Sequence, residues 1–499
     1  MGAGDVSSAF MATPLRQRVI TTKLPLSISS LSGEPLLLHL KKALNGLRSA
    51  SQEWVLYLTE IVGALGLPTC SLEPCLFSGM LPSKKPCMML AYVDDIIACT
   101  EDEKHIDHIF DVIGGKVSIK RTGLIHPSSK GGQLKFLGRL VTRQKGDKAL
   151  LVSLPEDYLD ETFAAYGIKT PSRAPPDLTA ILDREDGKDS PLSADAHARL
   201  RSGLGKVAWL SQSRQDIRAF VSLIATQQSS PTSRTEDALR ALLKFMKGDM
   251  KVVLRLPNEC EALMSNAFEI PHVVAFSDAS HAPMKSTGRR GVTGGVLTFG
   301  CCCIKTLSRH QQLVSLSSME SELHALQSVS QEMSALQKVI GRILSTFLEV
   351  SVDEVPGVLY SDSESALKLL RNLDVPRKSR HLEIRIEWIK ERVSLGKLSL
   401  VFRRGVNNPS DLLTKCLGSA AFGIHRSTLG FQVCEGSLAG LVAVAKRSLV
   451  FIEVCCRENS AICQACRDLG IQYIGISKDM EKRSVFSNLL ETLKQMKPG

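Results

Sequence analysis

Long apolar runs are missing from this sequence of 499 residues, and aromatic residues make up only 5% of it, against 43% hydrophobic residues in all. Because no stretch of about 18 apolar residues occurs, we expect no membrane-spanning helix and a soluble globular protein. No apolar leader opens the sequence, so we expect an intracellular protein, not a secreted one, with its 14 cysteines reduced. A second CxxC pair at zinc-finger spacing is also missing, which argues against a zinc site.

Acidic residues are outnumbered, since 62 Lys and Arg stand against 51 Asp and Glu, which gives a formal charge of +11. A basic balance favours a polyanionic partner, because cationic side chains neutralise phosphates and release counterions. The strongest local excess, nine Lys or Arg against three Glu, runs from Arg377 to Arg404. We interpret it either as a solvated face or as a surface that follows a nucleic-acid backbone. The length allows two to four domains.

Two adjacent acids, Asp94 and Asp95, interrupt an apolar run that extends from Met88 to Ile97. Each apolar side chain buried in such a strand contributes on the order of 2 kcal/mol. Acids at the middle of the run therefore need a reason, such as a bound metal ion. The pattern predicts a hairpin turn that presents carboxylate oxygens to Mg²⁺.

The run from Tyr92 to Asp95 resembles the catalytic box of reverse transcriptases, and further motifs are similar to those of Ty1/copia-type retrotransposon polymerases. Asp5 opens a segment that resembles the family's Asp-Val-Lys-Thr-Ala-Phe box. The resemblance implies that Asp5, Asp94 and Asp95 are catalytic and hold two Mg²⁺ ions, with Mn²⁺ as an alternative. It also implies substrate-binding roles for Phe10, which would exclude ribonucleotides, and for Lys42, Gly46, Arg48 and Tyr92.

The resemblance continues downstream of the two acids. Lys135–Gly138 is similar to the turn that grips the primer, and the segments at 201–205, 213–217 and 243–248 are similar to boxes of the family in the same order. The family places a fingers region before its first catalytic aspartate, whereas four residues precede Asp5 here. We therefore expect an N-terminally truncated Pol polyprotein whose primer extension is very weak.

A second set of acids resembles the four-carboxylate centre of ribonuclease H, again with two Mg²⁺ ions. Asp278 follows an apolar strand at 273–276 and is expected where that strand opens into a loop. Glu320 and Glu322 begin a long helix expected from about Ser318 to Leu348. The other two acids of the set are Asp362, after a strand at Gly357–Ser361, and Asp411.

Glu320 and Glu322 are both candidate catalytic residues, but they lie about 200° apart on a helix and cannot both face one metal site. We favour Glu322 as the ligand, because Glu322–Ala325 resembles a step of retroviral ribonuclease H. Glu320 is then a first-turn acid that favours the helix dipole. Arg380 and His381 resemble the family's Lys-His pair, which implies a structural or substrate-orienting role.

These patterns predict an α+β and α/β protein of five segments. We expect a reverse transcriptase palm fragment at 1–169, a helical connection at 170–265, a ribonuclease H-like mixed sheet with flanking helices at 266–418, a linker at 419–447 and an unassigned α/β fragment at 448–499. In the last segment the expected elements are strands at 449–454 and 473–476 and helices at 461–469 and 484–496.

The resemblance implies an RNA-directed DNA polymerase with ribonuclease H activity. Its expected partners are an RNA template, RNA/DNA hybrids and deoxynucleoside triphosphates, with no membrane; a second copy of the chain or other retrotransposon proteins are candidate partners. The expected location is a cytoplasmic particle or the nucleus. Two alternatives stay open, namely a catalytically inactive nucleic-acid-binding remnant and a ribonuclease H without polymerase function.

Overall fold

The computed structural model describes residues 1–16, 20–23, 37–185, 187–257, 271–281, 288–300, 302–348, 352–372, 382–433, 451–454 and 473–476. The chain forms two compact units, Met1–Val433 and Cys434–Gly499. In the second unit, β18 (Phe451–Val454) pairs in parallel with β19 (Tyr473–Ile476), as the sequence predicts. The helices expected at 461–469 and 484–496 lie outside the described residues. No described helix is long and apolar enough to cross a membrane.

The first unit contains a ten-stranded antiparallel sheet in the order β17-β11-β10-β9-β8-β7-β1-β6-β5-β4. Its strands are β1 (Gly2–Val6), β4 (Leu76–Met80), β5 (Pro86–Tyr92), β6 (Asp95–Thr100), β7 (Ile119–Ile125), β8 (Gly132–Phe136), β9 (Arg139–Arg143), β10 (Leu150–Ser153), β11 (Val252–Leu256) and β17 (Phe431–Val433). A separate hairpin joins β2 (Ile20–Lys23) to β3 (Leu37–Leu40). Strand β1 lies between β6 and β7, far from its sequence neighbours.

Three helices share a core with the part of the sheet that contains β1, β4, β5 and β6. They are α1 (Ala9–Ala12), α2 (Ala50–Gly63) and α3 (Glu103–Gly114). Helix α3 buries Ile106, Ile109, Phe110 and Ile113, the 3.6-residue spacing of one apolar face. Asp102 caps it by accepting a hydrogen bond from the Lys104 N–H. Strands β5 and β6 alternate buried and half-buried residues, so one face of this hairpin joins the same core.

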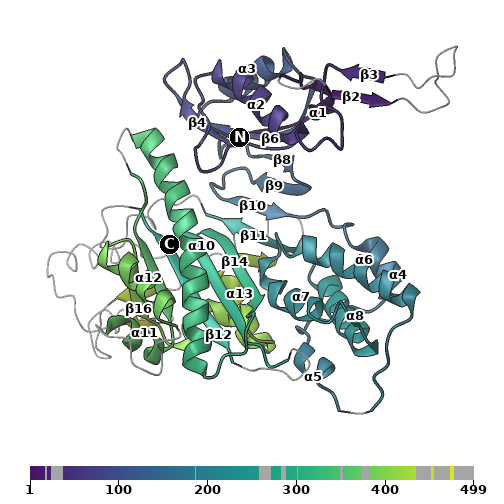
Figure 1. The fold of residues 1–499 in the computed structure, drawn as a ribbon, viewed down its shortest axis with the longest axis vertical. Helices are drawn as coiled ribbons and strands as arrows, with labels where there is room; N and C mark the ends of the chain where they lie inside the picture. Colours follow the sequence, from purple (N-terminus) through teal and green to yellow (C-terminus); the bar gives the residue numbers. More distant parts are fainter. Residues whose placement is uncertain are drawn as a thin grey trace, which may run out of the picture. The chain divides into compact units, whose positions relative to one another are not determined.

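Helices dominate the region where a helical connection is expected (Figure 1). They are α4 (Asp160–Ala165), α5 (Leu178–Leu182), α6 (Ala194–Leu210), the 3-10 helix η1 (Gln215–Ile217), α7 (Arg218–Ala225) and α8 (Ser233–Gly248). Ser193 caps α6, and a capping box begins α8 at Thr232. The chain then enters β11, which belongs to the ten-stranded sheet, so the connection is not purely helical.

A second, five-stranded sheet has the order β14-β13-β12-β15-β16. Strands β12 (Val273–Ser280), β13 (Val292–Phe299) and β14 (Cys302–His310) are antiparallel, whereas β15 (Gly357–Ser361) and β16 (Ser399–Phe402) run parallel to β12. Strand β12 continues through Asp278 to Ser280, so the expected loop at Asp278 is wrong. The reason is the partner strand, since β13 pairs with β12 along its whole length.

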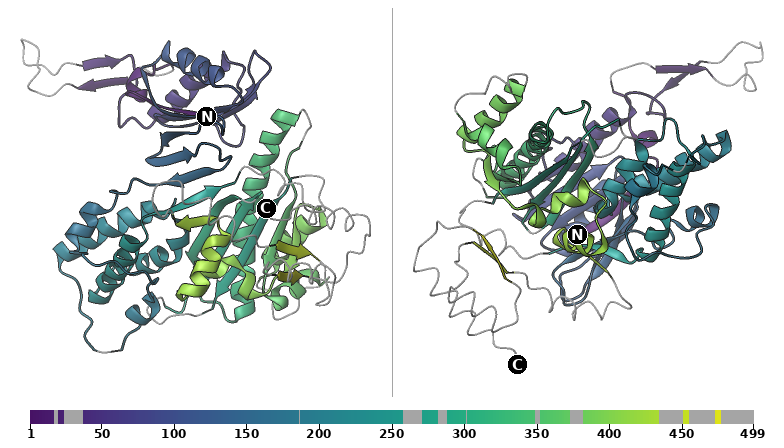
Figure 2. Two further views of the ribbon diagram at one scale, coloured as in Figure 1. Left: turned by 180° about the vertical axis from the view of Figure 1, so that it is seen from behind. Right: turned by 90° about the horizontal axis from the view of Figure 1, so that it is seen from below.

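Helices cover both faces of this sheet. The long helix α10 (Ser318–Leu348), α11 (Glu364–Arg371) and α12 (Glu383–Ser394) share a core with alternate residues of the sheet such as Val273 and Ala275. Helix α13 (Ser419–Thr428) lies on the face opposite α10, where Val296 joins the other core (Figures 1 and 2). The alternation follows from the two-residue period of a strand.

The segment expected to be a linker at 419–447 is instead folded over its described part, as α13 and β17. The physical reason is apolar burial, because Phe422 stacks on Phe220 at 5.9 Å between ring centroids and meets Phe245 at 5.6 Å. Phe431 is buried in the same core. Strand β17 then pairs with β11 and forms one edge of the ten-stranded sheet.

A buried charge network connects α13 with the helices of the connection. Arg214 binds the fully buried Asp216 with two hydrogen bonds, of 2.9 and 2.8 Å, and also binds Asp249 at 2.5 Å. Arg426 of α13 binds the same Asp249 oxygen at 2.7 Å. The charges of two arginines and two aspartates thus compensate one another in a place that is largely shielded from water.

We expect Asp216→Asn to lower the free energy of unfolding by about 3 kcal/mol, because it removes one charge from a buried pair. Urea denaturation of the metal-free chain measures this. The control is Asp157→Asn at an exposed position, which should change the value by less than about 0.5 kcal/mol. Equal effects of the two changes would contradict the assignment of the network.

Candidate metal centre

The second sheet brings two predicted acids side by side through parallel pairing. Ser277 of β12 is in register with Ser361, the last residue of β15. Asp278 is the next residue of β12, and Asp362 directly follows β15. Glu322 comes from the start of α10, which packs on β12. The three side chains therefore come from three elements, and only the folded sheet and helix bring them together.

Asp278, Glu322 and Asp362 each offer a carboxylate oxygen, and these three oxygens lie within 4.8 Å of one another. We call this set the carboxylate cluster. Among the described residues it is the only such group of three acids, histidines or cysteines of metal-binding spacing. Asp278 is buried, at 1% exposure. The proximity is unusual because like charges at this range repel one another.

The pKa values of the cluster show this crowding. Burial, followed by the charges of Asp278 and Asp362, raises the pKa of Glu322 to about 9. Burial also raises the pKa of Asp278 and that of Asp362, the latter with Asp278 as the next cause. In the protein without a metal ion, the cluster thus resists full ionisation at neutral pH.

The chemistry of the cluster fits a hard divalent cation. All donors are carboxylate oxygens, the ligand type that Mg²⁺ prefers. The Oε1 atom of Glu322 accepts a hydrogen bond from the Ala279 N–H at 3.3 Å, while Oε2 is buried without a hydrogen-bond partner. A bound cation would satisfy that oxygen and offset the repulsion, and Mn²⁺ has the same ligand preference.

Glu320 points elsewhere. Its carboxylate accepts a hydrogen bond from the Leu316 N–H at 2.9 Å and lies 3.7 Å from Nε2 of His324. The structure therefore places Glu322 in the cluster and Glu320 at the helix start, as the helical angle predicts.

Asp411 belongs to the 3-10 helix η4 (Pro409–Leu413), next to the cluster and outside its group of three. Its Oδ1 atom binds Nζ of Lys415 at 2.6 Å, and that Nζ also lies 3.5 Å from Oδ2 of Asp278. The hydroxyl of Thr414 donates a hydrogen bond to the same Oδ2 atom. Thr414 and Lys415 are site residues that the sequence argument missed, although they stand in the motif that carries Asp411.

Two glycines leave room for these contacts. A Cβ atom at Gly294, which pairs with Asp278, would lie 2.5 Å from Thr414 and 2.8 Å from the Ser410 carbonyl. A Cβ atom at Gly405 would lie 2.8 Å from Oδ2 of Asp362. A side chain at either position would force these neighbouring atoms to move. The close packing around the site therefore requires glycine at both positions.

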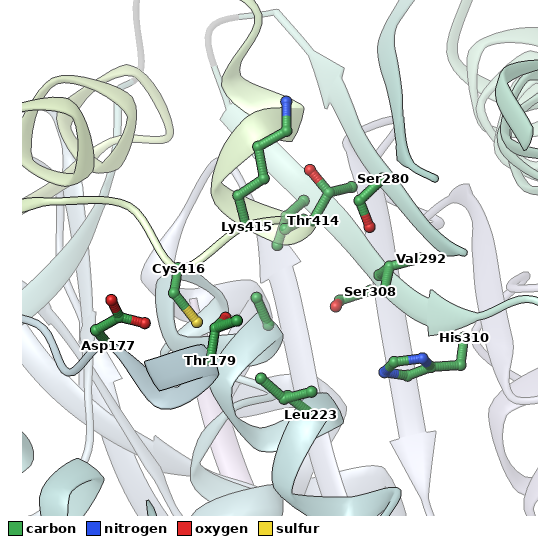
Figure 3. A pocket seen from close by; sticks show the side chains of 12 residues that line it. Asp177, Thr179, Leu223, Ser280, Val292, Ser308, His310, Thr414, Lys415 and Cys416 are labelled. Carbon is green, nitrogen blue, oxygen red and sulfur yellow. The ribbon is translucent and has the colours of Figure 1, made fainter. Parts of the chain in front are cut away.

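A cavity of about 320 Å³ adjoins the site, and Thr414 and Lys415 form part of its wall (Figure 3). Ser280 and His310 of the sheet and Thr179 of α5 lie on its other sides. The amino group of Lys415 points away from Thr179 and Leu223 in this view.

The palm acids lie on neighbouring strands. Asp5 of β1 is in register with Asp95 of β6, and Asp94 is exposed in the turn that joins β5 and β6. Val93 has a φ of 55° in this turn, and its carbonyl accepts a hydrogen bond from Nε1 of Trp54 at 2.5 Å. The hairpin predicted from the sequence is therefore present.

The group of three carboxylates described above does not include Asp5, Asp94 or Asp95, so their predicted role as ligands of two Mg²⁺ ions stays a prediction. Burial, Asp94 and Asp5 still raise the pKa of Asp95, while a hydrogen bond from the Leu137 N–H works in the opposite direction. The charges of Asp5 and Asp94 therefore act on Asp95.

The predicted substrate-binding residues of the palm occupy different surroundings. Phe10 is half-buried against the core of α2 and α3, whereas Lys42, Arg48 and Tyr92 are exposed. Gly46 has a φ of 95° with open space around it. Arg380 and His381 lie outside the described residues.

Part of the expected basic face is also engaged inside the fold. The guanidinium of Arg403 stacks on Phe276 and Tyr360, at 5.1 and 5.5 Å from their ring centroids, and its Nε donates to the Asn407 carbonyl. Arg403 is therefore not a free phosphate contact, because stacking and burial use its side chain. Arg404 is exposed, while Arg377 and Lys378 lie outside the described residues.

Comparisons with known proteins show that the chain is similar in sequence to retroelement Pol proteins. The homologues of the chain are Ty1/copia-type retrovirus-related Pol polyproteins from transposons, which confirms the resemblance. The chain is 22% identical over 435 residues to the transposon TNT 1-94 polyprotein of Nicotiana tabacum. It is 25% identical over 431 residues to the transposon RE1 polyprotein of Arabidopsis thaliana. No protein-family model matches the chain.

The chain spans only 30% and 27% of the lengths of these two relatives, while they cover 86% and 85% of the chain. Among solved structures, a foamy viral protease-reverse transcriptase in complex with an RNA/DNA hybrid has a TM-score of 0.43 and 14% identity, over 81% of this chain and 44% of that one. The same kind of protein with double-stranded DNA has a TM-score of 0.42 and 15% identity, over 81% of this chain and 67% of that one.

The raised pKa of Glu322 predicts how stability depends on pH. The pKa of Glu322 is about 9 in the metal-free folded protein and near 4.5 in the unfolded chain. Protonated Glu322 therefore stabilises the folded protein, and this contribution to the free energy of unfolding is complete below pH 4.5. It is lost as the pH rises through 9, by at most about 1.4 kcal/mol per pH unit. We expect Glu322→Gln to remove most of this decline.

Urea denaturation of the chelator-treated protein at pH 5, 7 and 8.5 measures the decline. In Glu322→Gln we expect a smaller fall of the unfolding free energy with pH, caused by Asp278 and Asp362. The matched control Glu320→Gln should show the same fall as the wild type. A wild-type protein whose unfolding free energy is constant over this range would contradict the crowding of the cluster.

Proposed function

We propose that the region around the carboxylate cluster hydrolyses the RNA strand of RNA/DNA hybrids with two divalent cations, in a chain that derives from a retrotransposon reverse transcriptase. The observation that carries the proposal is the convergence of Asp278, Glu322 and Asp362 within 4.8 Å, beside the central strand β12 and the end of β15. The homology to Pol polyproteins supports a role in nucleic-acid processing. The positive formal charge of +11 favours the same kind of partner.

Each residue of the site has a defined task in this proposal. Asp278, Glu322, Asp362 and Asp411 would hold the cations, which when bound activate the attacking water and stabilise the leaving oxygen. The Thr414 hydroxyl fixes one oxygen of Asp278, and the Ala279 N–H fixes one oxygen of Glu322. Gly294 lets η4 and Thr414 pack closely against β13, and Gly405 keeps the space beside Asp362 open. The chain's own part is thus to hold the carboxylates in place before any cation binds.

Polymerisation at Asp5, Asp94 and Asp95 is the second function that we propose, as a weak one. The register of Asp5 with Asp95 supports it, because it sets two acids on adjacent strands beside the turn that carries Asp94. An RNA template and deoxynucleoside triphosphates would be the substrates. The carboxylate cluster is the group of metal-binding spacing found among the described residues, so we expect hybrid cleavage to dominate. We propose a cytoplasmic particle or the nucleus as the location, where such substrates occur.

The test is cleavage of an RNA/DNA hybrid, labelled in its RNA strand, by the full chain in Mg²⁺. We expect Asp278→Asn and Asp362→Asn to reduce cleavage by at least about 100-fold, because each removes a charged ligand. Glu322→Gln should act similarly. Its matched control, Glu320→Gln, changes the same chemical group two residues away and should leave more than about half of the activity.

Circular dichroism and thermal melting show that each variant is folded. Equal losses in the two glutamine variants would contradict the assignment of Glu322. A wild-type chain that binds the hybrid and Mg²⁺ but never cleaves would favour the inactive remnant, and cleavage without any primer extension would favour the ribonuclease H alternative.

A further inference from the structure

Lys415 brings a positive charge to the carboxylate cluster. Its Nζ atom lies 2.6 Å from Oδ1 of Asp411 and 3.5 Å from Oδ2 of Asp278. Its charge also lowers the pKa of Asp278, of Glu322 and of Asp362, against the larger upward effect of burial on each. One ammonium group therefore acts on four carboxyl groups that come from four elements of the fold.

We propose that Lys415 is an internal counter-ion, which pairs with the carboxylates in the metal-free protein and leaves them when divalent cations bind. This inference rests on the proposed metal-dependent function of the cluster. It assigns Lys415 a positioning role, because the residue acts through the carboxylates.

The geometry supports an exchange between lysine and cation. The ammonium group of Lys415 lies 3.5 Å from Oδ2 of Asp278. A cation bound to this oxygen would therefore meet a like charge at short range. The Lys415 side chain is 45% exposed, whereas that of Asp278 is 2% exposed. The lysine can thus move to water on its flexible stem while the aspartate stays in place.

Two consequences follow from this exchange. Without cations, Lys415 stabilises the folded protein by offsetting repulsion among the acids. With cations, the same charge opposes binding, so the site holds cations more weakly than its carboxylates alone would. A lysine that merely braces the fold would stabilise both forms and leave cation affinity unchanged.

Lys415→Met tests the proposal, since methionine keeps most of the side-chain length and removes the charge. Lys415→Arg keeps the charge. Lys397→Met is the matched control, because Lys397 is 43% exposed and binds Glu354 at 3.2 Å, in an ion pair that includes none of the cluster. Electron paramagnetic resonance with Mn²⁺ alone gives the affinity, and the component lost in Asp362→Asn is assigned to the cluster.

We expect Lys415→Met to bind Mn²⁺ at the cluster at least about tenfold more tightly than the wild type, while Lys397→Met and Lys415→Arg stay within about threefold. Thermal melting should show that Lys415→Met is less stable than the wild type in chelator and that saturating Mn²⁺ closes most of the gap. Circular dichroism confirms that the variant is folded.

Unchanged or weaker Mn²⁺ binding by folded Lys415→Met, beside a wild type that binds, would overturn the counter-ion while leaving the metal centre intact. A stability loss of the same size with and without Mn²⁺ would also overturn it. If neither protein shows an Asp362-dependent component, the proposed function fails and the inference fails with it.

Discussion

Repulsion among buried carboxylates is the constraint on which the second sheet depends. At an effective dielectric constant of 20, two unit charges about 5 Å apart repel by about 3 kcal/mol. In the metal-free protein the raised pKa of Glu322 relieves part of this repulsion among Asp278, Glu322 and Asp362, and rigid elements hold each acid in place. Parallel pairing of β12 with β15 fixes the two aspartates, and α10 fixes the glutamate. Hydrogen bonds from Thr414 and Ala279 then set individual oxygens.

The elements behind the sheet support the same arrangement. Asp411 and Lys415 follow one another across η4 and the turn after it, and the chain then enters α13, whose Phe422 is anchored among Phe220 and Phe245. The network of Arg214, Asp216, Asp249 and Arg426 ties α13 to the connection helices. Helix α13, which follows the site in the chain, is thus held both by apolar burial and by ion pairs, and neither includes a residue of the cluster.

The sequence predicts the acids of the cluster well, because an acid directly after an apolar strand is a local pattern and the helical angle separates Glu322 from Glu320. Family motifs supply Asp411 and the hairpin at Asp94. What the sequence could not predict depends on tertiary partners. Strand β12 extends past Asp278 only because β13 lies beside it, and α13 folds only because Phe422 finds a core. Lys415 becomes a site residue only when η4 reaches the sheet, and the pairing of Asp5 with Asp95 depends on the position of β1 beside β6.

Proton release on cation binding measures how strongly the carboxylates of the cluster repel one another. If the cluster is crowded enough to keep Glu322 protonated at pH 7, as a pKa of about 9 requires, then a bound Mg²⁺ ion must displace that proton. Calorimetric titration with Mg²⁺ in two buffers of different ionisation enthalpy counts the protons released. We expect about one proton per site from the wild type and close to none from Glu322→Gln. Binding of Mg²⁺ to the wild type without proton release would contradict it.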